Sequence, residues 1–60
     1  MCLATVYKES DNSVIFRNVS RIEVEGENII LRDIMGDERT IQGRIQMVDL
    51  ANSVVKLICD

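Results

Sequence analysis

The chain has 60 residues, a net charge of −3 and a sequence pI of about 4.7. Its length fits one small domain over residues 1–60, and its negative charge makes nucleic acid a poor partner, because affinity for nucleic acid comes largely from Lys and Arg contacts to phosphates. Apolar residues make up 47% of the sequence but only Tyr7 and Phe16 are aromatic, so aliphatic side chains must fill the core. Because so short a chain buries only about 60% of the surface of its unfolded form, we expect apolar surface to remain for a partner subunit.

The first predicted element is a strand at the beginning of the chain. From Cys2 to Glu9 apolar residues occupy both alternating faces, a pattern typical of a strand that is buried on both sides. The short polar residues of Ser10–Ser13 favour a turn, because their side chains can bond their own backbone. A short second strand over Val14–Arg17 is expected to end at Asn18.

A β-hairpin is predicted in the middle of the chain. Arg21–Glu25 alternates between apolar and charged residues, which indicates a strand with one solvated face. Gly26 and Asn28 tolerate the positive φ angles of a tight turn, and Ile29–Ile34 returns as a mostly apolar strand.

The remaining residues predict three more strands. A turn over Met35–Asp37 leads into Glu38–Gln42, which we expect to be an edge strand. Gly43 marks a bulge or corner, and the alternating run Arg44–Leu50 is followed, after a tight turn, by a strand over Ser53–Ile58. Apolar residues at 41, 45 and 48 also fit one face of a helix, but the glycine and the β-branched residues favour a strand.

Together these patterns predict an all-β fold, a small antiparallel barrel or rolled sheet of about seven short strands, which is homodimeric. The strands that are apolar on both sides are the candidates for the dimer interface: Cys2–Tyr7, Ile29–Ile34 and Val54–Ile58. Lys8 and Glu9 interrupt the first apolar run before it reaches the length of a signal sequence. A cytoplasmic protein with both Cys2 and Cys59 reduced is therefore expected.

The beginning of the chain also carries a family resemblance. The sequence Met1-Cys2-Leu3-Ala4 at the start of an all-β chain of this length resembles the CooT family, small nickel-binding accessory proteins of carbon monoxide dehydrogenase maturation. The similarity extends over nearly the whole chain, at Val19–Val24, Gly26, Ile29–Leu31 and Gly43–Leu50. The resemblance implies a homodimer that binds nickel through the cysteine at the second position, which is Cys2 here.

A second family also begins Met-Cys: the HypC-type chaperones of hydrogenase assembly, in which the terminal cysteine carries an iron fragment. Those chains usually run longer and end in a helix, whereas this chain ends in a predicted strand and lacks a glycine-proline stretch after its start. CooT is therefore the better match.

Cys2 is the predicted metal ligand. If Met1 is removed, the thiolate and α-amine of Cys2 can chelate one metal ion; if Met1 remains, a deprotonated amide nitrogen can replace the amine. Since one chain offers only two such ligands, a twofold dimer would be needed to supply four, in a planar set that suits Ni(II) or Cu(II) or a tetrahedral set that suits zinc. The alternative is that Cys2 is a small buried hydrophobe without a metal. Cys59 is expected to be a passive part of the last strand.

Other functions find less support in the sequence. There is no histidine, no nucleophile paired with a base and no phosphate-binding glycine loop, so the chain is predicted not to be an enzyme. Asp33, Asp37 and Glu38 lack the spacing of a calcium loop. The predicted function is a nickel-binding accessory protein, or metallochaperone, for a nickel enzyme. The alternatives are a HypC-like chaperone and a metal-free interaction module that binds protein or, weakly, RNA.

Overall fold

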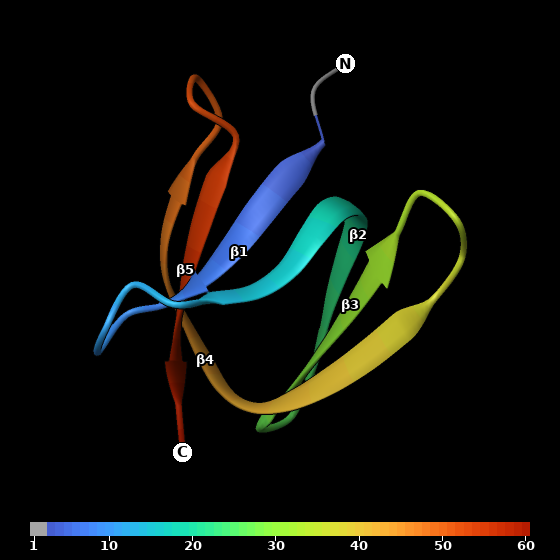
Figure 1. Ribbon diagram of the computed structural model, residues 1–60. Helices are drawn as coiled ribbons and strands as arrows, with labels where there is room; N and C mark the ends of the chain where they lie inside the picture. Colours follow the sequence, from blue (N-terminus) through green and yellow to red (C-terminus); the bar gives the residue numbers. More distant parts are fainter. Residues whose placement is uncertain (1–2) are drawn as a thin grey trace.

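The computed structural model describes residues 3–60, and every regular element in them is a β-strand (Figure 1). The all-β, mainly antiparallel fold expected from the sequence is thus confirmed. The five strands are β1 (Ala4–Lys8), β2 (Val14–Glu25), β3 (Asn28–Asp33), β4 (Glu38–Asp49) and β5 (Val54–Cys59).

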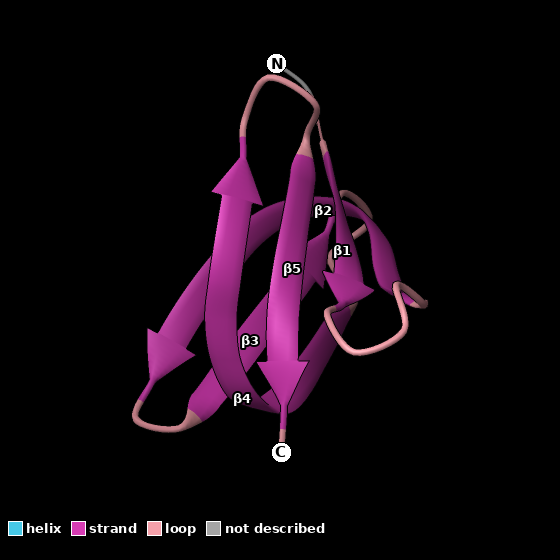
Figure 2. Cartoon of the chain, turned by 90° about the vertical axis from the view of Figure 1, so that its left-hand side faces the viewer, coloured by secondary structure: helices cyan, strands magenta, loops and turns pink. Residues whose placement is uncertain are grey.

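The strands form one sheet that closes on itself (Figure 2). Each strand pairs with the next along the chain in antiparallel orientation, from β1–β2 to β4–β5. The closing pair is β1 with β5, which run parallel, with Thr5 opposite Val54 and Lys8 opposite Leu57. Because this pair is parallel, the start of β1 and the end of β5 lie at opposite ends of the barrel (Figures 1 and 2).

The expectation of about seven short strands was wrong, because two predicted breaks lie inside long strands. β2 continues through Asn18, where φ is +56°, and changes partner there: its first half pairs with β1 and its second half with β3. β4 continues through Gly43 in the same way, pairing first with β3 and then with β5. Each long strand of 12 residues therefore bends from one part of the sheet into another. The helical alternative for residues 41–50 is excluded, since residues 41–49 belong to β4.

Gly43 is required where β4 passes β5. A Cβ at this position would overlap the carbonyl oxygen of Ile58 and would lie 3.1 Å from the Cα of Cys59. The predicted corner at Gly43 is thus a point of close backbone approach, which is a common use of glycine within a strand.

The core of residues 3–60 is small, and its buried side chains are aliphatic. They come from all strands except β4: Val6, Val19, Ile29, Leu31, Val55 and Leu57. In β1 only Val6 is buried and its neighbours are half-buried, so the expected burial of both faces is incomplete. β3 and β5 each place two alternate residues in this core, which accounts for much of their apolar character.

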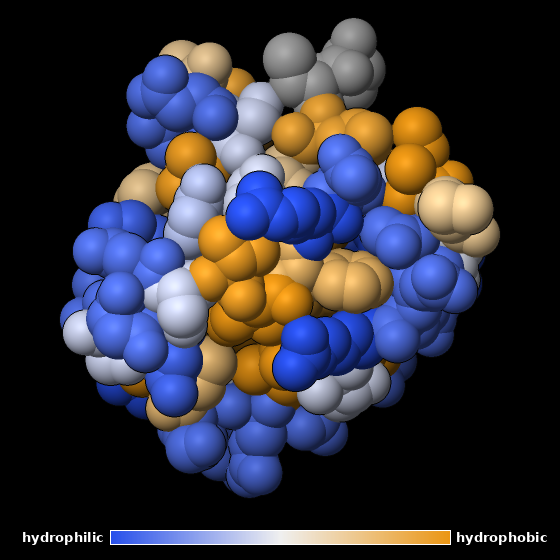
Figure 3. Space-filling view, in the orientation of Figure 1, coloured by the Kyte–Doolittle hydropathy of each residue, from blue (hydrophilic) through white to orange (hydrophobic). Residues whose placement is uncertain are grey.

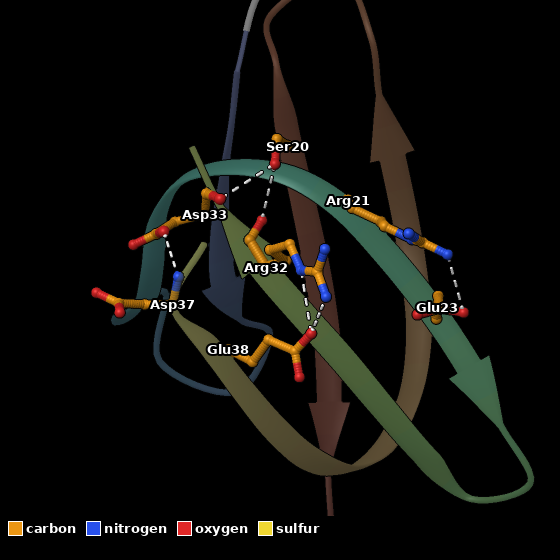
Figure 4. A network of polar contacts seen from close by, with 7 residues as sticks. All are labelled: Ser20, Arg21, Glu23, Arg32, Asp33, Asp37 and Glu38. Carbon is orange, nitrogen blue, oxygen red and sulfur yellow. Dashed lines mark hydrogen bonds and ion pairs between the residues drawn. The ribbon is translucent and has the colours of Figure 1, made fainter. Parts of the chain in front are cut away.

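The predicted central hairpin is confirmed. β2 and β3 pair from Val19 opposite Asp33 to Glu25 opposite Asn28, and Gly26 in the turn has φ +59°. The next turn, between β3 and β4, is organised by Asp33, whose carboxylate oxygen Oδ1 accepts the N–H groups of Met35 and Asp37, both at 2.9 Å. Figure 4 shows the bond to Asp37. Such a side-chain bond to following amides is what favours Asp in turns.

We predict that Gly43→Ala lowers the free energy of unfolding by about 1–3 kcal/mol, because the added Cβ forces the backbones of β4 and β5 apart. Chemical denaturation measures the change. Gly26→Asn is the matched control: the space around Gly26 is open, and asparagine tolerates the positive φ there, so the change should stay within about 0.5 kcal/mol. Equal losses in the two variants would contradict the packing argument.

Candidate functional site

The described chain begins at one end of the barrel, between two turns. The Thr5 N–H donates to the carbonyl of Ser53 at 2.9 Å, which holds the β4–β5 turn beside the start of β1. On the other side, Ala4 is paired with Val19 of β2, and the Ile34 N–H donates to the carbonyl of Asn18 at 3.0 Å. The β3–β4 turn therefore lies at the same end. We call this region, made of Leu3 and the two turns, the Leu3 end (Figure 1).

The Leu3 end exposes large apolar side chains. Leu50 and Met35 are each 85% exposed, Ile34 is 64% exposed and Val48, near the end of β4, is 51% exposed. Figure 3 shows hydrophobic surface at this end over the β3–β4 turn. Apolar side chains gathered at one end of so small a protein are typical of a surface that a partner covers.

Both turns at the Leu3 end are fixed by carboxylates. Asp33 holds the β3–β4 turn, as described above, and Asp49 does the same for the β4–β5 turn. Its carboxylate accepts the Asn52 main-chain N–H at 3.1 Å and the Asn52 side-chain amide at 2.9 Å. These donors stabilise the charged form and lower the pKa of Asp49 below its ordinary value. The exposed Leu50 and Met35 are thus carried on ordered turns.

The sequence predicts a functional site at Cys2, next to the Leu3 end, but it does not predict the exposed apolar residues there. The sequence patterns place Ile34 and Leu50 at the ends of predicted strands and Met35 in a predicted turn, and they do not predict that these side chains are exposed. The available signal was a large apolar residue within or beside a predicted turn, since such segments are ordinarily polar. The strands proposed as interface candidates instead contribute much of their apolar surface to the core.

Cys2, the predicted metal ligand, lies outside the described residues. Cys59 ends β5 as predicted; it is half-buried, has a free thiol and is paired with Gly43 at the opposite end of the barrel from Leu3. Among residues 3–60, no group of three or more His, Cys, Asp or Glu side chains is arranged to hold a metal ion. The part of the chain that the structure describes therefore contains no ligand set of its own.

Many of the charged residues weighed for other functions lie on an exposed polar face over β2, β3 and β4 (Figure 4). The Arg32 Nε donates to the Glu38 carboxylate at 3.0 Å, and Arg21 lies 3.3 Å from Glu23. Glu38 raises the pKa of the Arg32 guanidinium through this bond. Arg21 and Arg32 are therefore each paired with a neighbouring carboxylate, and Glu38 is engaged as an ion-pair partner.

These features define a small closed β-sheet protein with exposed apolar side chains at one end. Residues 3–60 include no helix that is long and apolar enough to cross a membrane. The family model described as "CO dehydrogenase accessory protein CooT" matches residues 1–58, and the chain belongs to this family. The protein is accordingly an accessory protein of CO dehydrogenase and not itself an enzyme.

The fold is that of a solved structure. The crystal structure of a candidate CooT from Carboxydothermus hydrogenoformans superimposes with a TM-score of 0.90, at 18% sequence identity and over 98% of each chain. At this identity the similarity establishes the shared fold. Among curated proteins there is no match to the chain. Membership of the CooT family decides between the two Met-Cys families that the sequence brought into consideration.

We predict that the Asn52→Ala variant moves the pKa of Asp49 up toward its ordinary value of 3.8, because it removes the side-chain amide donor. In the native protein the folded pKa is depressed, so the stability that Asp49 contributes is present above its unfolded pKa and is lost as the pH falls through the folded value. An NMR titration of the Asp49 carboxyl carbon checks this; Asp11, whose pKa is lowered by Ser13 instead, is the internal control and should not move.

Proposed function

We propose that this CooT-family protein binds Ni(II) through Cys2 at the interface of a homodimer and holds or delivers the ion for maturation of carbon monoxide dehydrogenase. The family supports the client, and the exposed apolar surface of the Leu3 end supports the dimer. That surface is the single observation that carries the proposal, because it surrounds the place where the described chain begins, directly after Cys2.

Dimerisation through the Leu3 end gives the apolar residues a partner. Fully burying a side chain such as Leu50 or Met35 contributes about 1.5–3 kcal/mol. A twofold axis through this end would place the same turns of both chains against each other, as a self-complementary interface requires. It would also bring the Cys2 residues of the two subunits together, because one chain offers only two metal ligands and four are needed.

The proposed ligands are the Cys2 thiolate and an adjacent main-chain nitrogen from each subunit. The thiol must lose its proton to bind, so nickel binding weakens as the pH falls. Two sulfur and two nitrogen donors in a plane suit Ni(II), and they suit Cu(II) as well, so metal supply decides which ion is bound. The reducing cytoplasm is the proposed setting, since it keeps such a thiol reduced.

Cys59 is outside the proposed site. It lies at the far end of the parallel β1–β5 pair from Leu3, and β5 alone spans about 20 Å. The alternative function is that of an interaction module that binds no metal. The number of metal ions bound per chain distinguishes this alternative from the proposed nickel-binding function.

We predict that the wild-type protein binds about half an equivalent of Ni(II) per chain, as expected for one ion between two subunits. The Cys2→Ser variant should lose this binding, and Cys59→Ser, the matched control, should retain it. Isothermal titration and native mass spectrometry of the same samples give the metal count and the subunit number. A Cys2→Ser variant that still bound a full equivalent would rule the site out.

We also predict that Leu50→Asp weakens dimerisation more than tenfold, because it places a carboxylate in an apolar contact. Val24→Asp is the control: Val24 is 58% exposed but lies at the β2–β3 hairpin, away from the Leu3 end. Sedimentation equilibrium measures both variants. The interface would have to be placed elsewhere if the Val24 variant dissociated and the Leu50 variant did not.

A further inference from the structure

The long strands β2 and β4 each have stretches of edge that no strand of the described chain pairs with, and two of these stretches line the same groove. β2 pairs with β1 in its first half and with β3 in its second, so one edge of Val14–Asn18 has no ladder partner. β4 pairs with β3 through Glu38–Gln42 and with β5 only from Gly43 onward, so one edge of Glu38–Gln42 is also free of a ladder in the described chain. An unpaired edge presents N–H and C=O groups that can pair with another extended segment.

A groove lies between these two edges, and its volume is about 400 Å³. One wall is formed by Ser13–Ile15 of the β1–β2 region, the other by Arg39–Gln42 of β4, and Lys8, Cys59 and Asp60 complete the lining. Figure 3 shows apolar surface in the centre of this face, between the first halves of β2 and β4, with strongly hydrophilic side chains around it. The groove is far from the Leu3 end, because it adjoins the ends of β1 and β5 and not the start of β1.

The edge of β4 in this groove has the right main-chain groups to accept a strand. The Asp60 N–H donates to the Gln42 carbonyl at 3.0 Å, so Gln42 faces the groove, whereas the Gly43 N–H donates to Glu27 on the opposite side. Since main-chain groups alternate along a strand, the N–H and C=O of Thr40 face the groove as well. A segment paired with Thr40 would run antiparallel to β4, in the position that β5 would occupy if it continued.

The charged side chains that line the groove favour an acidic peptide segment. The lining has two cationic side chains, Lys8 and Arg39, against one carboxylate side chain, Asp60, in a protein whose net charge is −3. Neither cation forms an ion pair within residues 3–60; the Arg39 Nη1 donates across the groove to the Ile15 carbonyl at 2.8 Å. A carboxylate makes a stronger, charge-assisted bond to a guanidinium than a neutral carbonyl does. An acidic ligand can therefore displace this exposed contact and open the groove.

We propose that this groove is a docking site for an extended, acidic peptide segment of another protein, which adds a short strand to the free edge of β4. Main-chain bonds to Thr40 give the pairing, as in other cases of strand addition. Alternate apolar side chains of the peptide pack on Val14, Ile15 and Ile41, and its carboxylates bind Arg39 and Lys8.

The test is a titration of the ¹⁵N-labelled, metal-free protein with a capped peptide of sequence Glu-Val-Thr-Val-Glu. Amide shifts are expected at Thr40, Gln42 and Asp60, and the same peptide with Lys in place of Glu should bind at least about tenfold more weakly. Methylating the peptide nitrogens that face Thr40 should abolish binding, whereas methylating the alternate nitrogens should not. Equal binding of the Lys peptide, or tolerance of both methylated forms, would overturn the proposal.

Variants of the protein test the proposed peptide binding independently. Arg39→Glu should weaken binding about tenfold, while Arg44→Glu, the same charge change further along β4, should leave it within twofold. Thr40→Pro removes an N–H that has no ladder partner, so it should block the peptide while the β3 amides keep their shifts; if this variant fails to fold, the comparison of the two arginine variants decides.

A dependence of the Thr40 shift on protein concentration, without peptide, would instead identify the edge as a self-association surface and contradict the proposal. Because the protein is free of metal throughout, a negative result leaves the proposed nickel site unaffected.

Discussion

The structure depends on two long strands that each serve two partners. β2 and β4 have to satisfy main-chain hydrogen bonds with one neighbour in their first half and with another in their second. This exchange bends both strands and allows five strands to enclose a core that, in residues 3–60, has only six buried side chains. It also leaves part of each edge of both long strands without a ladder partner among the described residues. Closure of the barrel and the open groove therefore have the same geometric cause.

The sequence predicted the class of fold and its local turns better than its strand count. Alternating residues in Arg21–Glu25 and Ile29–Ile34, with Gly26 between them, specify a hairpin through interactions that are local in sequence. Asn18 and Gly43 also gave correct local signals of unusual backbone, but whether a chain ends or bends at such a residue depends on the strands available on each side. The partners of β2 and β4 lie far away in sequence, so no local pattern could distinguish a bend from a break.

The candidate site was anticipated only in part. Cys2 drew attention to the correct family through its position, and the family matches residues 1–58. The exposed Leu50 and Met35 were recognisable as apolar residues near turns, but only the assembled fold places their two turns on either side of Leu3. The groove could not be found from sequence at all, because an unpaired edge is a property of the whole sheet.

The parallel pairing of β1 and β5 has a mechanical consequence. If the chain is pulled apart at Leu3 and Asp60, the two strands are drawn in opposite directions along their common axis, so the load falls in shear on the ladder between them. The four register pairs from Thr5–Val54 to Lys8–Leu57 then carry the force together and cannot open one after another as in a zipper. A core of this size would offer little resistance by itself, so the β1–β5 ladder is the part of the barrel that resists a force applied between its two ends.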